Sequence, residues 1–150
     1  MNSSPILYAE DDEHDVFFLQ HAFQAVGITN SLQIARDGQQ AIDYLSRPNL
    51  PGSAGELLPC LIMLDLKMPR VSGMEVLAWL RQDSNLPPLP VLILSSSAHP
   101  EEVHCAFALG ANAFVVKPSS VDERLRLVNA IKEFWLRFNQ PQVGGLQVAA

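Results

Sequence analysis

The sequence predicts a single doubly wound α/β domain, in which helices cover both faces of a parallel sheet. Two observations lead to this prediction. Five short apolar segments alternate with five segments of helical pattern, which is typical of right-handed β-α-β units. The last three apolar segments are nearly free of polar residues, as expected for strands that are covered on both sides. The length of 150 residues suits one domain with its own core.

Each predicted strand is a short run of mainly apolar residues followed by polar residues. Runs of this length fit strands better than helices, which usually need at least about ten residues. The five strands are predicted at residues 5–9, 32–35, 61–64, 91–94 and 113–116.

The predicted helices are recognised by their start and stop signals. Ser72 with Glu75, and Ser120 with Glu123, have the spacing of a capping box, which satisfies free N–H groups at a helix start. Gly27 is the stop signal of the first helix, in which apolar residues recur every three or four positions. The helices are predicted at residues 13–26, 39–45, 72–81, 100–110 and from 120 onward.

Two stretches interrupt this alternation. Residues 47–59 are rich in Pro and Gly and longer than most connections, which predicts a surface loop or a functional insertion. Residues 140–150, with one Pro and two Gly, are predicted to form a disordered tail. The domain is accordingly predicted to comprise residues 1–139.

Composition disfavours several classes of function. The formal charge of −6 argues against direct nucleic-acid binding, which needs a basic face. No stretch approaches the roughly 20 apolar residues of a membrane-spanning helix, and the N-terminus lacks the basic flank of a signal peptide. Cys60 and Cys105 lie on apolar segments and are predicted to be buried free thiols. These features together predict a cytoplasmic protein without membrane contact.

Polar residues suited to one reaction follow four of the predicted strands. Glu10 and Asp11 follow the first strand, and Asp65 follows the third. Ser95 and Lys117 follow the fourth and fifth. The carboxyl ends of parallel strands meet at one edge of the sheet, where open α/β folds place their ligands. The sequence therefore predicts a pocket in which a phosphoryl group is transferred onto Asp65.

Phosphorylation of a carboxylate needs positive charge, because the nucleophile and the incoming group are both anionic. Mg²⁺ prefers oxygen ligands, which Glu10, Asp11 and Asp65 can supply. The Ser95 hydroxyl and the Lys117 ammonium are placed to bind phosphoryl oxygens. Each feature alone has a simpler explanation, since acidic runs often begin solvated helices, Lys-Pro pairs form turns and Ser caps helices. Their combination at four strand ends favours the phosphoryl site.

Several segments together resemble the signature blocks of response-regulator receiver domains. The resemblance spans about residues 5–138, and its motifs are specific as a set. It implies a flavodoxin-like (βα)5 fold with strand order 2-1-3-4-5 and Asp65 as the phosphoacceptor. The segments are ILYAEDD at 6–12, LIMLDLKMP at 61–69 with Ser72-Gly73, Ser95, and VVKP at 115–118.

The resemblance also implies a ligand set for the metal and the phosphoryl group. Glu10, Asp11 and Asp65 would bind Mg²⁺ together with the main-chain carbonyl of Lys67. Ser95 and Lys117 would contact the phosphoryl group.

A conformational switch is implied by the same resemblance. Phosphorylation would draw Ser95 toward the phosphate and let Phe114 turn inward, reshaping the face around the fourth and fifth helices. Phe114 is equally well explained as ordinary strand packing. Receivers often have a cis peptide after the lysine of the fifth strand, so the bond between Lys117 and Pro118 is expected to be cis.

Two departures from a minimal receiver resemble stand-alone receivers that are paired with phytochrome-type and related histidine kinases, some of which dimerise. One departure is the stretch 47–59. The other is the aromatic end of the last helix, where Trp135 and Phe138 either complete the core or, if exposed, form a patch for a partner or a second copy.

The leading functional interpretation is a single-domain response regulator. It would take a phosphoryl group from a sensor histidine kinase, signal to a downstream protein or phosphotransfer protein, and catalyse only its own phosphorylation and dephosphorylation. One alternative is an aspartate-nucleophile phosphatase or phosphotransferase, although Lys67 occupies the position where such enzymes carry a general acid. A phosphate-independent pseudo-receiver adaptor is the other, and the complete set of site residues disfavours it.

Overall fold

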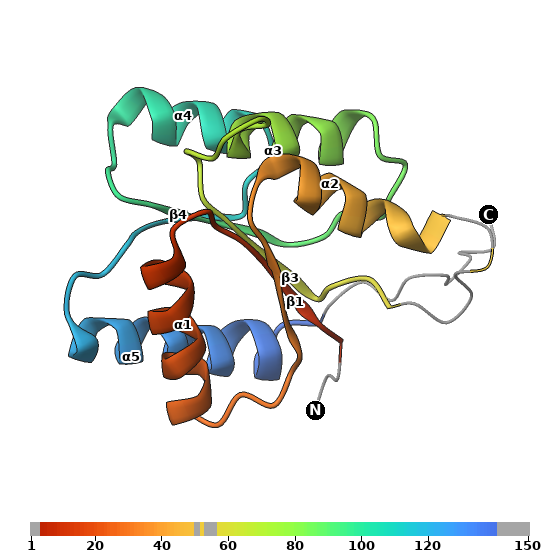
Figure 1. Cartoon of the computed structure of the whole chain (residues 1–150). Helices are drawn as coiled ribbons and strands as arrows, with labels where there is room; N and C mark the ends of the chain where they lie inside the picture. Colours follow the sequence, from red (N-terminus) through yellow and green to blue (C-terminus); the bar gives the residue numbers. More distant parts are fainter. Residues whose placement is uncertain (1–3, 50–51, 53–56, 141–150) are drawn as a thin grey trace.

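Five parallel strands form the central sheet, in the order β2-β1-β3-β4-β5 (Figure 1). This order confirms the fold class and the strand arrangement expected above, and each strand bound lies within one residue of its predicted position. The computed structural model describes residues 4–49, 52 and 57–140. The strands are β1 (Ile6–Ala9), β2 (Leu32–Ala35), β3 (Leu61–Leu64), β4 (Val91–Ser95) and β5 (Ala113–Val116).

Helices connect the strands, and side chains cap most of their N-termini. Asp12, Asp37, Ser72 and Ser120 each accept a hydrogen bond from a backbone N–H of the first helical turn, which would otherwise lack a partner. A 3-10 turn, η1 (Arg47–Asn49), follows α2, and a π-helix, η2 (Lys132–Phe138), continues α5. The helices are α1 (Glu13–Ala25), α2 (Gly38–Ser46), α3 (Gly73–Gln82), α4 (Pro100–Ala108) and α5 (Val121–Ile131).

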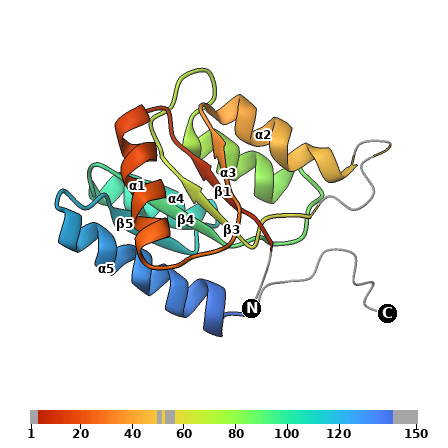
Figure 2. The same ribbon diagram turned by 60° about the horizontal axis from the view of Figure 1, so that its bottom comes forward.

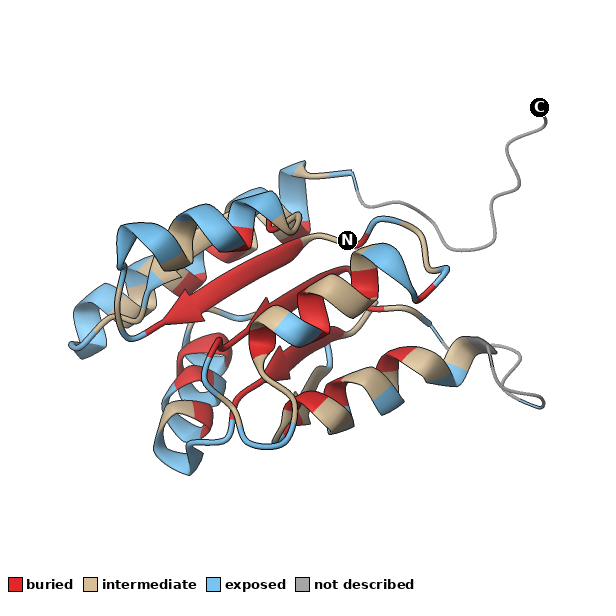
Figure 3. Ribbon diagram, turned by 90° about the horizontal axis from the view of Figure 1, so that it is seen from above, coloured by how far each residue is buried: buried red, intermediate tan, exposed pale blue. Residues whose placement is uncertain are grey.

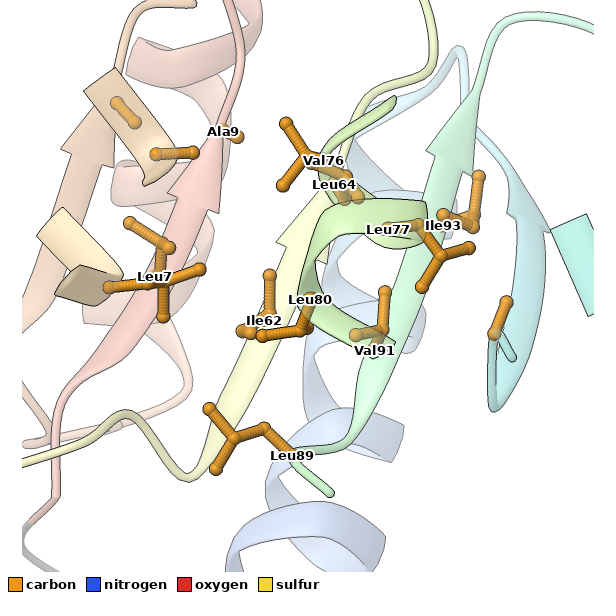
Figure 4. Close-up of a cluster of buried hydrophobic side chains, with 14 of the residues drawn as sticks. Leu7, Ala9, Ile62, Leu64, Val76, Leu77, Leu80, Leu89, Val91 and Ile93 are labelled. Carbon is orange, nitrogen blue, oxygen red and sulfur yellow. The ribbon is translucent and has the colours of Figure 1, made fainter. Parts of the chain in front are cut away.

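The helices form two layers around the sheet. Helices α1 and α5 lie side by side on one face, and α2, α3 and α4 cover the other (Figures 1 and 2). Successive strand residues point to opposite faces, so Leu7 and Ile62 join the core under α3 (Figure 4). Tyr8 and Met63 join the core under α1 and α5.

Burial falls off from the centre of the sheet to its edges (Figure 3). All residues of β1, β3 and β4 are buried, which explains their unbroken apolar sequences. The edge strand β5 is half-buried and ends at the exposed Val116, so coverage on both sides is confirmed for β3 and β4 but not for β5.

Two local expectations are wrong. Cys60 is buried as predicted, but Cys105 is exposed, because α4 packs through the neighbouring Ala106 and turns Cys105 outward. No peptide bond between described residues is cis, so the bond between Lys117 and Pro118 is trans. The trans isomer of an X-Pro bond is the more stable one by about 0.5–1 kcal/mol.

Of the aromatic side chains at the end of the last helical segment, one packs on the core and two are exposed. Trp135 is half-buried against the core under α1 and α5, as the packing interpretation predicts. Phe134 and Phe138 are 54% and 66% exposed. Much of the stretch 47–59, and residues 141–150 of the predicted tail, lie outside the described residues. In the described part of the chain, no helix is both long and apolar enough to cross a membrane.

Gly73 holds the start of α3 against the segment that follows β3. Its N–H donates to the Leu66 carbonyl at 3.0 Å. A Cβ at Gly73 would lie 2.1 Å from the Asp65 carbonyl oxygen, well inside van der Waals contact. Only glycine therefore allows this close approach.

We expect Gly73→Ala to lower the free energy of unfolding by about 1–3 kcal/mol, because the added methyl must displace the Asp65 backbone. Urea unfolding of the two proteins measures this difference. Alanine is the better helix former, so equal or greater stability of the variant would show that the close approach is not a constraint.

Candidate functional site

The carboxyl ends of β1 and β3 place two acids side by side. Ala9 pairs with Leu64, and the Asp65 N–H donates to the Ala9 carbonyl at 3.0 Å, which extends this register by one residue. Glu10 and Asp65 consequently leave neighbouring strand ends in the same direction. The predicted convergence of the strand ends is confirmed for this pair.

Three carboxylates gather at this edge of the sheet. One oxygen each from Glu10, Asp11 and Asp65 lies within 4.8 Å of the other two. Glu10 is 0% and Asp65 6% exposed, whereas Asp11 faces solvent. An oxygen-only set with one open side fits a hard divalent cation, which keeps several waters. The residues present thus fit the metal that the sequence analysis expects.

Lys117 supplies the positive charge of the site. It directly follows β5, and its backbone N–H donates to the Ser95 carbonyl at 2.7 Å. Its Nζ donates to Glu10 at 2.5 Å and lies 3.6 Å from an Asp65 oxygen. Burial alone would lower the pKa of Lys117, but hydrogen bonds to Glu10 and to Asp15 outweigh it and raise the pKa. The lysine therefore stays charged and holds the acids together.

Glu10 is the most constrained acid of the cluster. The pKa of Glu10 is raised to about 7, because burial and the Asp65 carboxyl group raise it more than the Lys117 ammonium lowers it. The Tyr8 hydroxyl donates to Glu10 Oε1 at 3.3 Å. Burial and the Glu10 charge raise the pKa of Tyr8, so this hydroxyl keeps its proton and remains a donor.

The other expected site residues surround this centre. Ser95 is buried at the end of β4, and its Oγ accepts a bond from the Ser97 N–H at 3.3 Å. Phe114 pairs with Ile93 in register, is half-buried and packs on the core under α3. Lys67 is exposed on the segment after Asp65.

Two residues that contact the centre were not predicted from the sequence. Asp15, in the first turn of α1, forms an ion pair with Lys117 at 2.9 Å. Tyr8 bonds Glu10 from within β1. The alternation of a strand could have identified Tyr8, because residues two apart point to the same face. No comparable signal marks Asp15, because its contact depends on the direction in which α1 leaves β1.

Comparisons with known proteins agree with this geometry. A family model described as "Response regulator receiver domain" matches residues 6–131. The chain is 34% identical to the probable methanogenesis regulatory protein FilR2 of Methanothrix harundinacea, over 90% of this chain and 85% of that protein. It is 31% identical to response regulator Rcp1 of Synechocystis, over 87% and 88% of the two chains.

Solved structures with the same fold include metal-bound and phosphorylated proteins. The Mn²⁺-bound form of Rcp1 superposes with a TM-score of 0.81 at 29% identity and covers 93% of this chain and 99% of its own. The phosphorylated cyanobacterial phytochrome response regulator RcpA superposes with a TM-score of 0.82, at the same identity and coverage.

The raised pKa of Glu10 predicts how stability depends on pH. Between its ordinary value of 4.5 and about 7, native Glu10 holds a proton that the unfolded chain has released. The metal-free protein should therefore lose stability as the pH rises through this window. Urea unfolding in EDTA, at several pH values, tests this. Glu10→Gln should flatten the profile between pH 4.5 and 7, and parallel profiles of the two proteins would contradict the assignment.

Proposed function

Since this chain belongs to the response-regulator receiver family, we propose that it is a single-domain response regulator whose phosphoacceptor is Asp65. One observation carries the choice of residue. Asp65 directly follows β3, at the point where two further carboxylates and the Lys117 ammonium converge. The Asp65 side chain is 8% exposed, so it is largely shielded from water, and its carboxylate lies beside that of the exposed Asp11.

The proposed reaction is a transfer between a kinase histidine and this carboxylate. An Asp65 oxygen attacks the phosphorus of a phosphohistidine, and a new O–P bond forms while the N–P bond breaks. The imidazole nitrogen leaves with the bonding electron pair and recovers a proton from solvent. Hydrolysis of the acyl phosphate later returns Asp65 to the carboxylate and releases inorganic phosphate. The protein would thus catalyse only its own modification and its reversal.

Glu10, Asp11 and Asp65, with the main-chain carbonyl of Lys67, would hold a Mg²⁺ ion. The bound ion supplies the charge neutralisation that allows an anionic nucleophile to approach a phosphoryl group. The oxygen-only donor set supports this choice of metal. A related protein, Rcp1, binds Mn²⁺ in its solved structure, and Mn²⁺ accepts similar ligands.

Ser95 and Lys117 would bind oxygens of the transferred group. Lys117 lies 3.6 Å from an Asp65 oxygen, so a short movement brings its ammonium to a phosphoryl oxygen. Ser95 lies in register beside Val116 and directly precedes the loop to α4. A shift of its hydroxyl toward the phosphate would move this loop and let Phe114 turn inward. The face formed by α4, β5 and α5 would then carry the signal.

The partners follow from the same proposal. A sensor histidine kinase would supply the phosphoryl group, and the similarity to RcpA supports a phytochrome-type kinase. A downstream protein or a phosphotransfer protein would receive the signal in the cytoplasm. The exposed Phe134 and Phe138 support a homodimer formed through the end of the last helical segment.

Labelling by a small phosphodonor tests the proposal directly. We expect incubation with acetyl phosphate and Mg²⁺ to add one phosphate to the protein, as measured by intact mass. Asp65→Asn should abolish the addition, and EDTA should prevent it in the unchanged protein.

Asp12→Asn is the matched control for this labelling. Asp12 is the next acid along the chain, but it caps α1 instead of joining the carboxylate cluster, and asparagine caps a helix equally well. This variant should still be labelled. Addition of phosphate to Asp65→Asn would refute the assignment of the phosphoacceptor.

A further inference from the structure

Lys117 has an acidic partner that the proposed reaction does not use. The Lys117 Nζ donates to an Asp15 oxygen at 2.9 Å, which is closer than its 3.6 Å approach to Asp65. Asp15 is not a member of the carboxylate cluster that fits a cation. Any influence of Asp15 on the reaction must therefore act through Lys117 or through the field of its charge.

The charge balance around Lys117 makes this contact significant. Glu10, Asp11, Asp15 and Asp65 can bring four negative charges to the edge where Lys117 brings one positive charge. A phosphoryl group on Asp65 adds further negative charge. The ammonium has three hydrogens, and two of them are already donated to Glu10 and Asp15. The third hydrogen can be donated to a phosphoryl oxygen, but the two acids hold the ammonium at its present position and compete with the phosphoryl group for its charge.

The two acids differ in what their release would cost. Glu10 is 0% exposed, and a buried carboxylate that loses its cation is strongly destabilised. The Asp15 side chain is 39% exposed, so water can replace the lysine. Asp15 and Lys117 also line a cavity of about 30 Å³, which is large enough for a water molecule. Asp15 is therefore the partner that Lys117 can leave more easily.

We propose that Asp15 is a positioning residue that draws the Lys117 ammonium toward the first turn of α1 and competes with the phosphoryl group for it. This inference rests on the proposed role of Asp65. Without phosphate, Asp15 keeps the lysine on the α1 side of the site. With phosphate, Lys117 leaves Asp15, whose charge then repels the phosphoryl group. Both effects oppose phosphorylation, so Asp15 lowers the affinity of the site for a phosphoryl group.

Beryllofluoride, an anion that mimics the phosphoryl group on a carboxylate, provides the test. At saturating Mg²⁺, we expect Asp15→Asn to bind beryllofluoride about two- to fivefold more tightly than the unchanged protein, as the loss of a half-exposed ion pair predicts. Its labelling by acetyl phosphate should accelerate by a similar factor. Asp15→Glu keeps the carboxylate and should return both values toward those of the unchanged protein.

Glu13→Gln is the matched control. It removes the same charge from the first turn of α1, but Glu13 forms no ion pair with Lys117. Glu13→Gln can change the affinity for beryllofluoride only through long-range electrostatics, so its effect should vanish at high salt. The effect of Asp15→Asn should persist, because salt screens a direct contact less.

The outcomes separate the two proposals. If the unchanged protein neither binds beryllofluoride nor becomes labelled, the proposed function is wrong. If it does both, and Asp15→Asn binds no more tightly than Glu13→Gln, the inference about Asp15 is overturned. Urea unfolding tests whether each variant is folded. If Asp15→Asn is unfolded, Asp15→Ser is used in its place.

Discussion

A single lysine ammonium holds together the acids on which the candidate site depends. Three carboxylates within 4.8 Å of one another would repel, and Glu10 is fully removed from water. Lys117 offsets this cost by pairing with Glu10 and Asp65 at once. The lysine is held in place because its backbone continues the ladder between β4 and β5 through the Ser95 carbonyl. The pairing of the strands thus determines where the lysine lies relative to the acids.

This arrangement is what a transient acyl phosphate requires. A site that neutralised its acids permanently would not release them to a metal and a phosphoryl group. Here the cation is a lysine side chain that follows the edge strand, with two buried partners, Glu10 and Asp65, and one half-exposed partner, Asp15. The ion pair to Asp15 is easily exchanged for water, whereas the pair to Glu10 is not. These contacts therefore stabilise the unphosphorylated protein. Because the pair with Asp15 can be broken at low cost, they also allow Lys117 to move to a phosphoryl group on Asp65.

Most of the fold could be predicted from the sequence because its signals are local. Capping residues such as Ser72 and Ser120 and apolar runs such as Leu61–Leu64 depend on neighbours in the chain. The gathering of the acids and Lys117 followed from one topological rule about parallel sheets. The contact between Asp15 and Lys117 spans 102 residues and depends on the direction in which α1 leaves β1, which no local pattern records. Likewise, the exposure of Cys105 depends on which side of α4 meets the sheet.

A structure of the protein with Mg²⁺ and beryllofluoride would test most directly whether Lys117 moves from its acids to the phosphoryl group. We expect the Lys117 Nζ to lie about 3 Å from a fluorine atom of the anion on Asp65, without a bond to Asp15. A structure in which Lys117 keeps its bonds to both Glu10 and Asp15, while other groups hold the anion, would contradict this expectation.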